Sequence, residues 1–149
     1  MRNCWLPGAK TAIMNANRFL LDTSAILTLI EDEDGADRVE EVLRRETALL
    51  PWPVLLEAYY ISQQERGEAE ANRRYALIKQ LPVKVMWEID EATLLTAARL
   101  KATQHLSLAD AMIAAYAIRT QATLLHKDPE FDALTDLVAL EALPYKNQS

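Results

Sequence analysis

The sequence is poor in several features that mark particular classes of protein. It has one cysteine, Cys4, so it contains no disulfide framework, and we expect a protein of the reducing cytoplasm. Only three of its 149 residues are glycine and six are proline, which argues against long flexible linkers. No apolar run approaches the roughly 20 residues that a membrane span needs, and residues 1–17 lack the apolar stretch of a secretory signal. We therefore expect no association with a membrane.

The chain also lacks an excess of positive charge. Its net charge is -6 and its pI is about 4.9, with no basic stripe, which argues against broad, non-specific binding to duplex nucleic acid. An acidic balance does not exclude a nuclease, because carboxylates can hold metal ions while a few basic residues act locally. It also suits a protein that binds a basic partner. Half of the residues are apolar and 26% are charged, which is typical of one ordinary globular domain.

Short apolar runs alternate with helical patterns along the chain. The runs predict strands at 19–21, 47–50, 83–86, 122–125 and 137–140. The helical patterns lie at 25–30, 36–45, 53–66, 68–81, 90–104 and 107–120, with a short helical turn at 129–134. This alternation predicts an α/β domain with a mostly parallel central sheet covered on both sides by helices. Residues 1–17 form an N-terminal extension in this interpretation, and Met14 is an alternative start to Met1.

Three carboxylates stand alone within apolar runs: Asp22, Glu57 and Asp110. An isolated buried carboxylate costs several kcal/mol unless it is paired or holds a cation. Asp22 follows the first predicted strand and Asp128 follows the fourth, and ligand sites of parallel sheets collect at such strand ends. If the fold brings these acids together they repel one another, and a divalent metal ion is the most economical way to keep them ionised.

Each acid also has a purely structural explanation. Asp22 and Asp128 suit helix N-caps, the latter because Pro129 follows it. Ser107 and Asp110 fit the capping-box pattern, in which an acid lies three residues after the cap. Glu57 lies near the start of a predicted helix, where the helix dipole favours an acid. The carboxylates by themselves leave both interpretations open.

Other polar residues near these acids are weaker candidates. Ser24 follows Asp22 by two residues, so its hydroxyl can bond the same carboxylate or a metal-bound water. Asp132, four residues after Asp128, could line the same pocket, but an exposed helical acid explains it as well. The two histidines are too isolated for a zinc site.

Four motifs occur in a characteristic order: FLLDTSA at 19–25, Glu57 in an apolar helix, LSLADAMIAA at 106–115 and LLHKDPEF at 124–131. In this order and at these spacings they resemble a PIN domain, and most of all the VapC-type toxins of bacterial toxin–antitoxin pairs. The resemblance covers roughly residues 18–140. It implies a three-layer α/β/α sandwich and a PIN-like nuclease domain over 18–149.

The resemblance also implies an activity, that of a metal-dependent endoribonuclease. Its acidic quartet maps onto Asp22, Glu57, Asp110 and Asp128, which would hold Mg²⁺ or Mn²⁺, and its polar helper maps onto Ser24, with Thr23 beside it. In such a site the metal activates a water for in-line attack on a scissile phosphate.

The chain departs from the family pattern in one place. His126 and Lys127 precede Asp128 where a threonine is common, so the polar groups around Asp128 are not fixed by the resemblance. Lys127 could help to hold the phosphate, or could be an ordinary surface lysine.

The implied partners are an RNA substrate, a cognate antitoxin whose basic segment covers the acidic pocket, and a second copy of the chain that packs against the apolar helices of residues 53–81. Two rival functions remain. A metal-dependent phosphotransfer protein usually has a second aspartate two residues after the first, where this chain has Ser24. A catalytically silent PIN-like binding module would not need the intact quartet. The sequence does not identify the RNA target, the antitoxin or the number of metal ions.

Overall fold

The computed structural model describes residues 17–146, and the predicted N-terminal extension therefore lies almost wholly outside the described residues. Five strands of this region form one sheet in the order β3-β2-β1-β4-β5, and every neighbouring pair is parallel. The strands are β1 (Arg18–Leu21), β2 (Thr47–Pro51), β3 (Lys84–Met86), β4 (Thr123–His126) and β5 (Leu140–Ala142). The predicted parallel sheet is confirmed.

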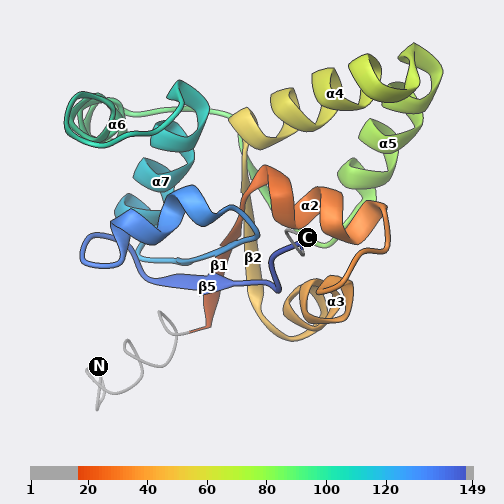
Figure 1. Cartoon of the computed structure of the whole chain (residues 1–149), viewed down its shortest axis with the longest axis horizontal. Helices are drawn as coiled ribbons and strands as arrows, with labels where there is room; N and C mark the ends of the chain where they lie inside the picture. The colour runs from red at the N-terminus through yellow and green to blue at the C-terminus, as the bar shows by residue number, and fades with distance from the viewer. Residues whose placement is uncertain (1–16, 147–149) are drawn as a thin grey trace, which may run out of the picture.

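Helices flank this sheet, which gives the predicted PIN-like α/β architecture (Figure 1). They are α2 (Thr23–Ile30), α3 (Ala36–Arg45), α4 (Trp52–Arg66), α5 (Glu68–Gln80), α6 (Glu91–Thr103), α7 (Leu108–Thr120) and the 3₁₀ helix η1 (Pro129–Leu134). Helices α4 and α5 meet at Gly67, whose φ of 91° suits glycine, and pack against each other away from the sheet (Figure 1). In the described residues no helix has the length and apolar character that crossing a membrane requires.

The order of the strands locates the place where a ligand site is expected. From the central strand β1 the chain proceeds to β2 and β3 on one side, and then returns to β4 and β5 on the other. Ligands of open parallel sheets bind at such a switch point, beyond the carboxyl ends of the strands. Asp22 directly follows β1 and Asp128 lies just beyond β4, so both acids stand at the switch point.

Small residues bring α7 close to the central strands. Ala111, Ala114 and Ala115 are fully buried, and α7 contacts both β1 and β4. Alanine side chains are small enough to permit this close approach. The consequence is that Asp110, in the first turn of α7, lies near the strand ends.

Two details differ from the sequence-based predictions. The last strand spans 140–142 instead of 137–140, because the amides of Leu137 and Val138 both donate to the carbonyl of Leu134 and prolong the turn after η1. The apolar residues Tyr75, Leu77, Ile78 and Leu81 predict the inner side of α5, but Leu77 is 42% exposed, while the charged Arg74 is buried.

Candidate metal centre

Asp22 is both a helix cap and a buried acid. One of its oxygens, Oδ1, accepts a hydrogen bond from the backbone amide of Ala25 at 2.8 Å, so Asp22 is the N-cap of α2, as its structural explanation predicted. Its exposed fraction is only 2%. Burial raises the pKa of Asp22 to about 7, the hydrogen bonds from Ser24 and Ala25 oppose this shift, and nearby acids add to it.

Ser24 connects the ends of β1 and β4. Its hydroxyl donates to the carboxylate of Asp22, with Oγ 2.7 and 2.8 Å from the two oxygens, and accepts from the amide of Lys127 at 2.8 Å. The hydroxyl proton is therefore committed to Asp22. Of the two partners expected for Ser24, a carboxylate and a metal-bound water, its hydroxyl therefore binds the carboxylate and orients it.

Asp110 lies in the first turn of α7, where Ser107 is the N-cap and accepts from the Asp110 amide at 3.1 Å. The predicted cap is thus present, and it does not exclude a functional role. Burial raises the pKa of Asp110 to about 7, and the negative charges of Asp128 and Glu57 raise it further. Asp110 therefore lies in a capped helix turn and is also destabilised in its charged form by burial and by neighbouring acids.

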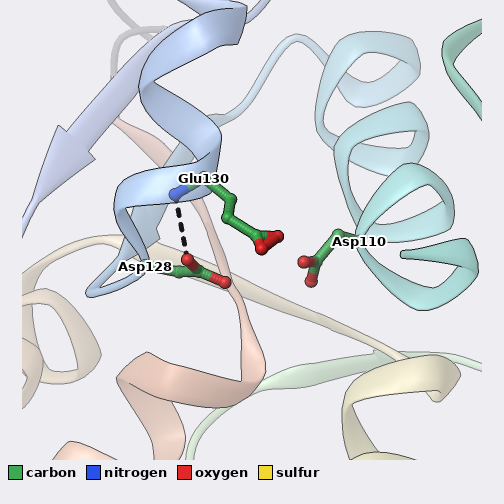
Figure 2. A group of neighbouring side chains, drawn as sticks. All are labelled: Asp110, Asp128 and Glu130. Carbon is green, nitrogen blue, oxygen red and sulfur yellow. Dashed lines mark hydrogen bonds between the residues drawn. The ribbon is translucent and has the colours of Figure 1, made fainter. Parts of the chain in front are cut away.

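Three carboxylates lie close together between the first turns of α7 and η1. Figure 2 shows Asp110 and Glu130 pointing toward each other, with Asp128 beside them. One oxygen from each of these three side chains lies within 4.8 Å of the other two. Asp128 also caps η1, because its Oδ1 accepts from the Glu130 amide at 2.9 Å. The sequence predicted Asp110 and Asp128 for this group and missed Glu130, whose only signal is its place in the first turn after the Asp-Pro cap.

Asp22 and Glu57 do not belong to that group of three, but they lie close enough to interact with it. The charges of Asp110 and Asp128 contribute to the raised pKa of Asp22, and the charge of Glu57 contributes to that of Asp110. Glu57, half-buried on α4, accepts a hydrogen bond of 2.5 Å from the hydroxyl of Thr23. The structure therefore places all four predicted acids at one end of the sheet. Only two of them, Asp110 and Asp128, belong to the group of three that also includes Glu130.

Two other predicted side chains are directed elsewhere. Lys127 was a candidate for holding phosphate or for an ordinary surface lysine, and the phosphate role stays a prediction; its amine contacts the loop that follows α2. Its side chain is 5% exposed, and its Nζ donates to the carbonyl of Asp34 at 2.7 Å. Asp132 accepts from the hydroxyl of Tyr145 at 2.7 Å. Neither side chain is part of the acidic group.

Among the residues that the structure describes, the acids at this end of the sheet have no basic partner. Within residues 17–146, none of the ion pairs includes any of the five acids Asp22, Glu57, Asp110, Asp128 and Glu130. The hydrogen-bond partners of Asp22, Glu57 and Asp128 are instead hydroxyls and backbone amides. Hard carboxylate oxygens that converge without a counter-charge are suited to Mg²⁺ or Mn²⁺, so the donor set fits such an ion.

The sequence profile of the PIN domain family matches residues 19–137, which covers most of the chain. The chain belongs to the PIN domain family. PIN domains are typically metal-dependent nucleases, and the acidic group of this PIN domain is compatible with a metal site of that kind. A comparison with curated protein sequences found no match.

Solved structures with this fold include VapBC toxin–antitoxin systems. A chain of VapBC2 from Rickettsia felis, bound to a DNA fragment from the promoter, has a TM-score of 0.70 and 17% identity, over 85% of this chain and 99% of that one. A chain of VapBC-1 from nontypeable Haemophilus influenzae has a TM-score of 0.65 and 22% identity, over 84% and 97%. VapC20 from Mycobacterium tuberculosis, a toxin that cleaves the sarcin–ricin loop, has a TM-score of 0.66 and 17% identity, over 85% and 99%. At these identities the likeness concerns the fold.

Proposed function

We propose that this PIN domain is a Mg²⁺- or Mn²⁺-dependent endoribonuclease and the toxin of a toxin–antitoxin pair. The observation that carries the proposal is the convergence of unpaired acids at the switch point of the sheet. Burial and mutual repulsion raise the pKa of both Asp22 and Asp110 to about 7, so that, without a cation, the surroundings disfavour the charged forms of these two carboxylates. Such an arrangement is unfavourable in a purely structural site and favourable where a cation binds.

In this proposal the metal ligands come from Asp22, Glu57, Asp110 and Asp128, with Glu130 as a further ligand candidate. When bound, the ion supplies charge neutralisation, polarisation of the scissile phosphate and a lower pKa for a coordinated water. The protein supplies the orientation of the acids. Ser24 holds both oxygens of Asp22, and Thr23 holds Glu57.

A basic antitoxin segment is the proposed partner. Several structural relatives are toxin–antitoxin complexes, among them one from Klebsiella pneumoniae. Asp128 is part of the lining of a cavity of about 440 Å³, in which the four acids Glu31, Glu33, Glu65 and Asp128 outnumber the two lysines Lys127 and Lys146. Both lysines pair with Glu33, and the remaining excess of carboxylates repels a phosphate backbone and attracts a lysine or arginine side chain, which supports the proposal that a basic protein segment occupies the cavity.

A second copy of the chain is the other proposed partner. An apolar groove on α4, α5 and the segment after β3 is lined by Trp52, Leu55, Leu56, Tyr59, Tyr75 and Trp87. Leu56 is 58% exposed and Trp87 is 55% exposed, and exposed apolar patches of this kind often mark protein interfaces. Sedimentation equilibrium of the purified protein tests the dimer.

The test of the activity is RNA cleavage by purified protein with Mn²⁺, with Mg²⁺ and with excess EDTA. We expect cleavage only with metal, and a fall of more than about 100-fold in Asp110→Asn and Asp128→Asn, since even the outer partners of metal ligands are worth about 10- to 100-fold. Asp132→Asn is the matched control, because Asp132 is an acid of the same η1 segment that binds Tyr145 instead. Its activity should stay near that of the wild type.

Three outcomes would overturn the proposal. Cleavage that continues in EDTA would exclude a metal-dependent mechanism. Folded wild-type protein that binds metal but cuts no RNA would favour the silent binding module. Transfer of phosphate onto Asp22 from a phosphodonor would favour the phosphotransfer protein.

A further inference from the structure

The loop of residues 126–130, which runs from the end of β4 into the first turn of η1, carries two of the three clustered acids, Asp128 and Glu130. Its backbone amides are bound by side chains. The amide of Lys127 donates to Ser24, the amide of Asp128 donates to Nδ1 of His126, and the amide of Glu130 donates to Asp128. Side chains therefore define the path of this loop, and one of them, His126, has no place in the chemistry described above.

His126 is the last residue of β4 and is fully buried. Its Nδ1 accepts from the Asp128 amide at 3.2 Å. The ring packs edge-on against Phe131, with centroids 5.2 Å apart, and tilted against Tyr145 at 6.3 Å. The other ring nitrogen, Nε2, is buried and has no hydrogen-bond partner among the described residues.

The two ring nitrogens of His126 differ in their hydrogen bonding, and only one of them contributes a bond within the described part of the chain. A neutral imidazole whose Nδ1 accepts a hydrogen bond carries its proton on Nε2. In His126 that proton is left without a partner, although buried polar groups are normally satisfied. An apolar side chain would fill this space without an orphaned donor. The polar contribution of His126 is therefore its one bond from Nδ1 to the Asp128 amide.

We propose that His126 is a positioning residue for the metal centre, because its Nδ1 fixes the backbone of Asp128 and thereby aims the carboxylates of Asp128 and Glu130 at Asp110. The bond joins a side chain to the amide two residues later, the geometry by which asparagine stabilises an Asx turn. Asp128 in turn binds the Glu130 amide, so the orientation passes from one acid to the next. This inference rests on the proposed metal centre and deepens it.

Three variants separate the hydrogen bond from the bulk of the ring. His126→Asn places an acceptor, Oδ1, close to the position of Nδ1. His126→Gln moves the polar group toward the position of Nε2, and His126→Leu removes it. We expect the dissociation constant for Mn²⁺, titrated without RNA, to stay within about threefold of the wild type in His126→Asn and to rise about tenfold or more in His126→Gln and His126→Leu, the size typical of lost outer-shell partners.

Phe131→Leu is the control for packing. It removes the ring that contacts His126 and leaves every hydrogen bond of the loop in place. Equal loss of Mn²⁺ affinity in Phe131→Leu and His126→Leu would show a structural role only and overturn the proposal. Binding as weak in His126→Asn as in His126→Gln would overturn it too. If His126→Leu does not fold, the pair of amide variants still decides between the two nitrogens.

A measurement on metal-free protein tests the bond itself. Nitrogen-15 NMR of the imidazole should show the tautomer with the proton on Nε2, and the Asp128 amide should exchange slowly in the wild type and in His126→Asn but fast in His126→Gln. Mn²⁺ binding combined with the opposite tautomer would overturn the role of His126. The expected tautomer in a wild-type protein that binds no Mn²⁺ would instead overturn the metal centre.

Discussion

Two regions of this molecule contain buried charged side chains, and they differ in whether those charges are paired with charges of opposite sign. On α5, the buried Arg74 places its Nε 3.0 Å from Glu70 and its Nη1 3.5 Å from Glu31 and 3.3 Å from the hydroxyl of Ser62. This network ties α5 to α4 and to the end of α2. Every charged group in it has a partner of opposite sign.

At the ends of β1 and β4 the acids have no partners of opposite charge within residues 17–146. Asp22 is held by a hydroxyl and an amide, and burial raises its pKa to about 7, whereas the hydrogen bonds from Arg73 and Arg74 lower the pKa of Glu70 to about 2. The chain thus compensates buried charge where it only holds helices together. It leaves buried charge uncompensated where, in our proposal, a cation from solution completes the site.

The largest expected effect in this comparison is on stability. Arg74→Ala should lower the free energy of unfolding by about 3 kcal/mol, since it removes one member of a buried ion network. Asp22→Asn should leave the stability of the metal-free protein unchanged or raise it, because it removes one charge from a repelling group. Urea unfolding in EDTA measures both.

Arg73→Ala is the matched control for Arg74. Arg73 also pairs with Glu70, but its side chain is 58% exposed, and such surface pairs contribute at most about 1 kcal/mol. A large loss in Asp22→Asn would show that its carboxylate is needed as a cap of α2. The contrast between the two regions would then be wrong.

Most of the fold could be predicted from the sequence because the buried strands are short apolar runs bounded by turn residues. Leu20 and Leu124 are fully buried in adjacent strands, as their runs indicated. The last strand was misplaced because Leu137 and Val138 look like strand residues, although their amides are held by the preceding turn. Hydrophobicity does not show which backbone groups are already bonded.

The site could be predicted in part for a similar reason. Asp22 and Asp110 stood out because apolar neighbours surround them. Glu130 did not, because an exposed acid in the first turn of a helix is common and only the fold brings it beside Asp110. Arg74 was missed because a Glu70–Arg74 pair at i,i+4 is typical of an exposed helix face.

A bound cation should supply the missing counter-charge at the ends of β1 and β4 and so stabilise the folded protein. At a concentration of about 100 times its dissociation constant, an ion that binds only the folded state adds about 2.7 kcal/mol of stability. For a domain near this size the melting temperature then rises by several degrees. Mn²⁺ should act at lower concentration than Mg²⁺. A thermal scan with and without metal measures the shift.

The same scan on variants locates the ion. The shift should vanish in Asp110→Asn, which belongs to the group of three, and shrink or vanish in Asp22→Asn. It should persist in Arg74→Ala at a lower starting temperature. An equal shift in wild type and Asp110→Asn would mean that the ion binds elsewhere, for example at the acidic loop of residues 31–34.

The smallest expected effect is a dependence on pH, and its sign differs between the regions. The pKa of Asp22 is raised from its ordinary 3.8 to about 7, so its contribution to stability is full below pH 3.8 and is lost as the pH rises through 7. For one such group the loss between pH 6 and pH 8 is about 1.4 kcal/mol. Glu70, with its pKa lowered to about 2, loses its contribution only as the pH falls into the acid range.

Metal-free wild-type protein should therefore become less stable from pH 6 to pH 8, and Asp22→Asn should reduce that slope. Glu70→Gln should leave the slope unchanged, because Glu70 is ionised in the folded and unfolded states throughout this range. Urea unfolding in EDTA at pH 6, 7 and 8 gives the three slopes, and any histidine contribution is common to all three proteins. If wild type and Asp22→Asn have the same slope, Asp22 is already ionised at pH 6 and carries no electrostatic strain for a metal ion to relieve.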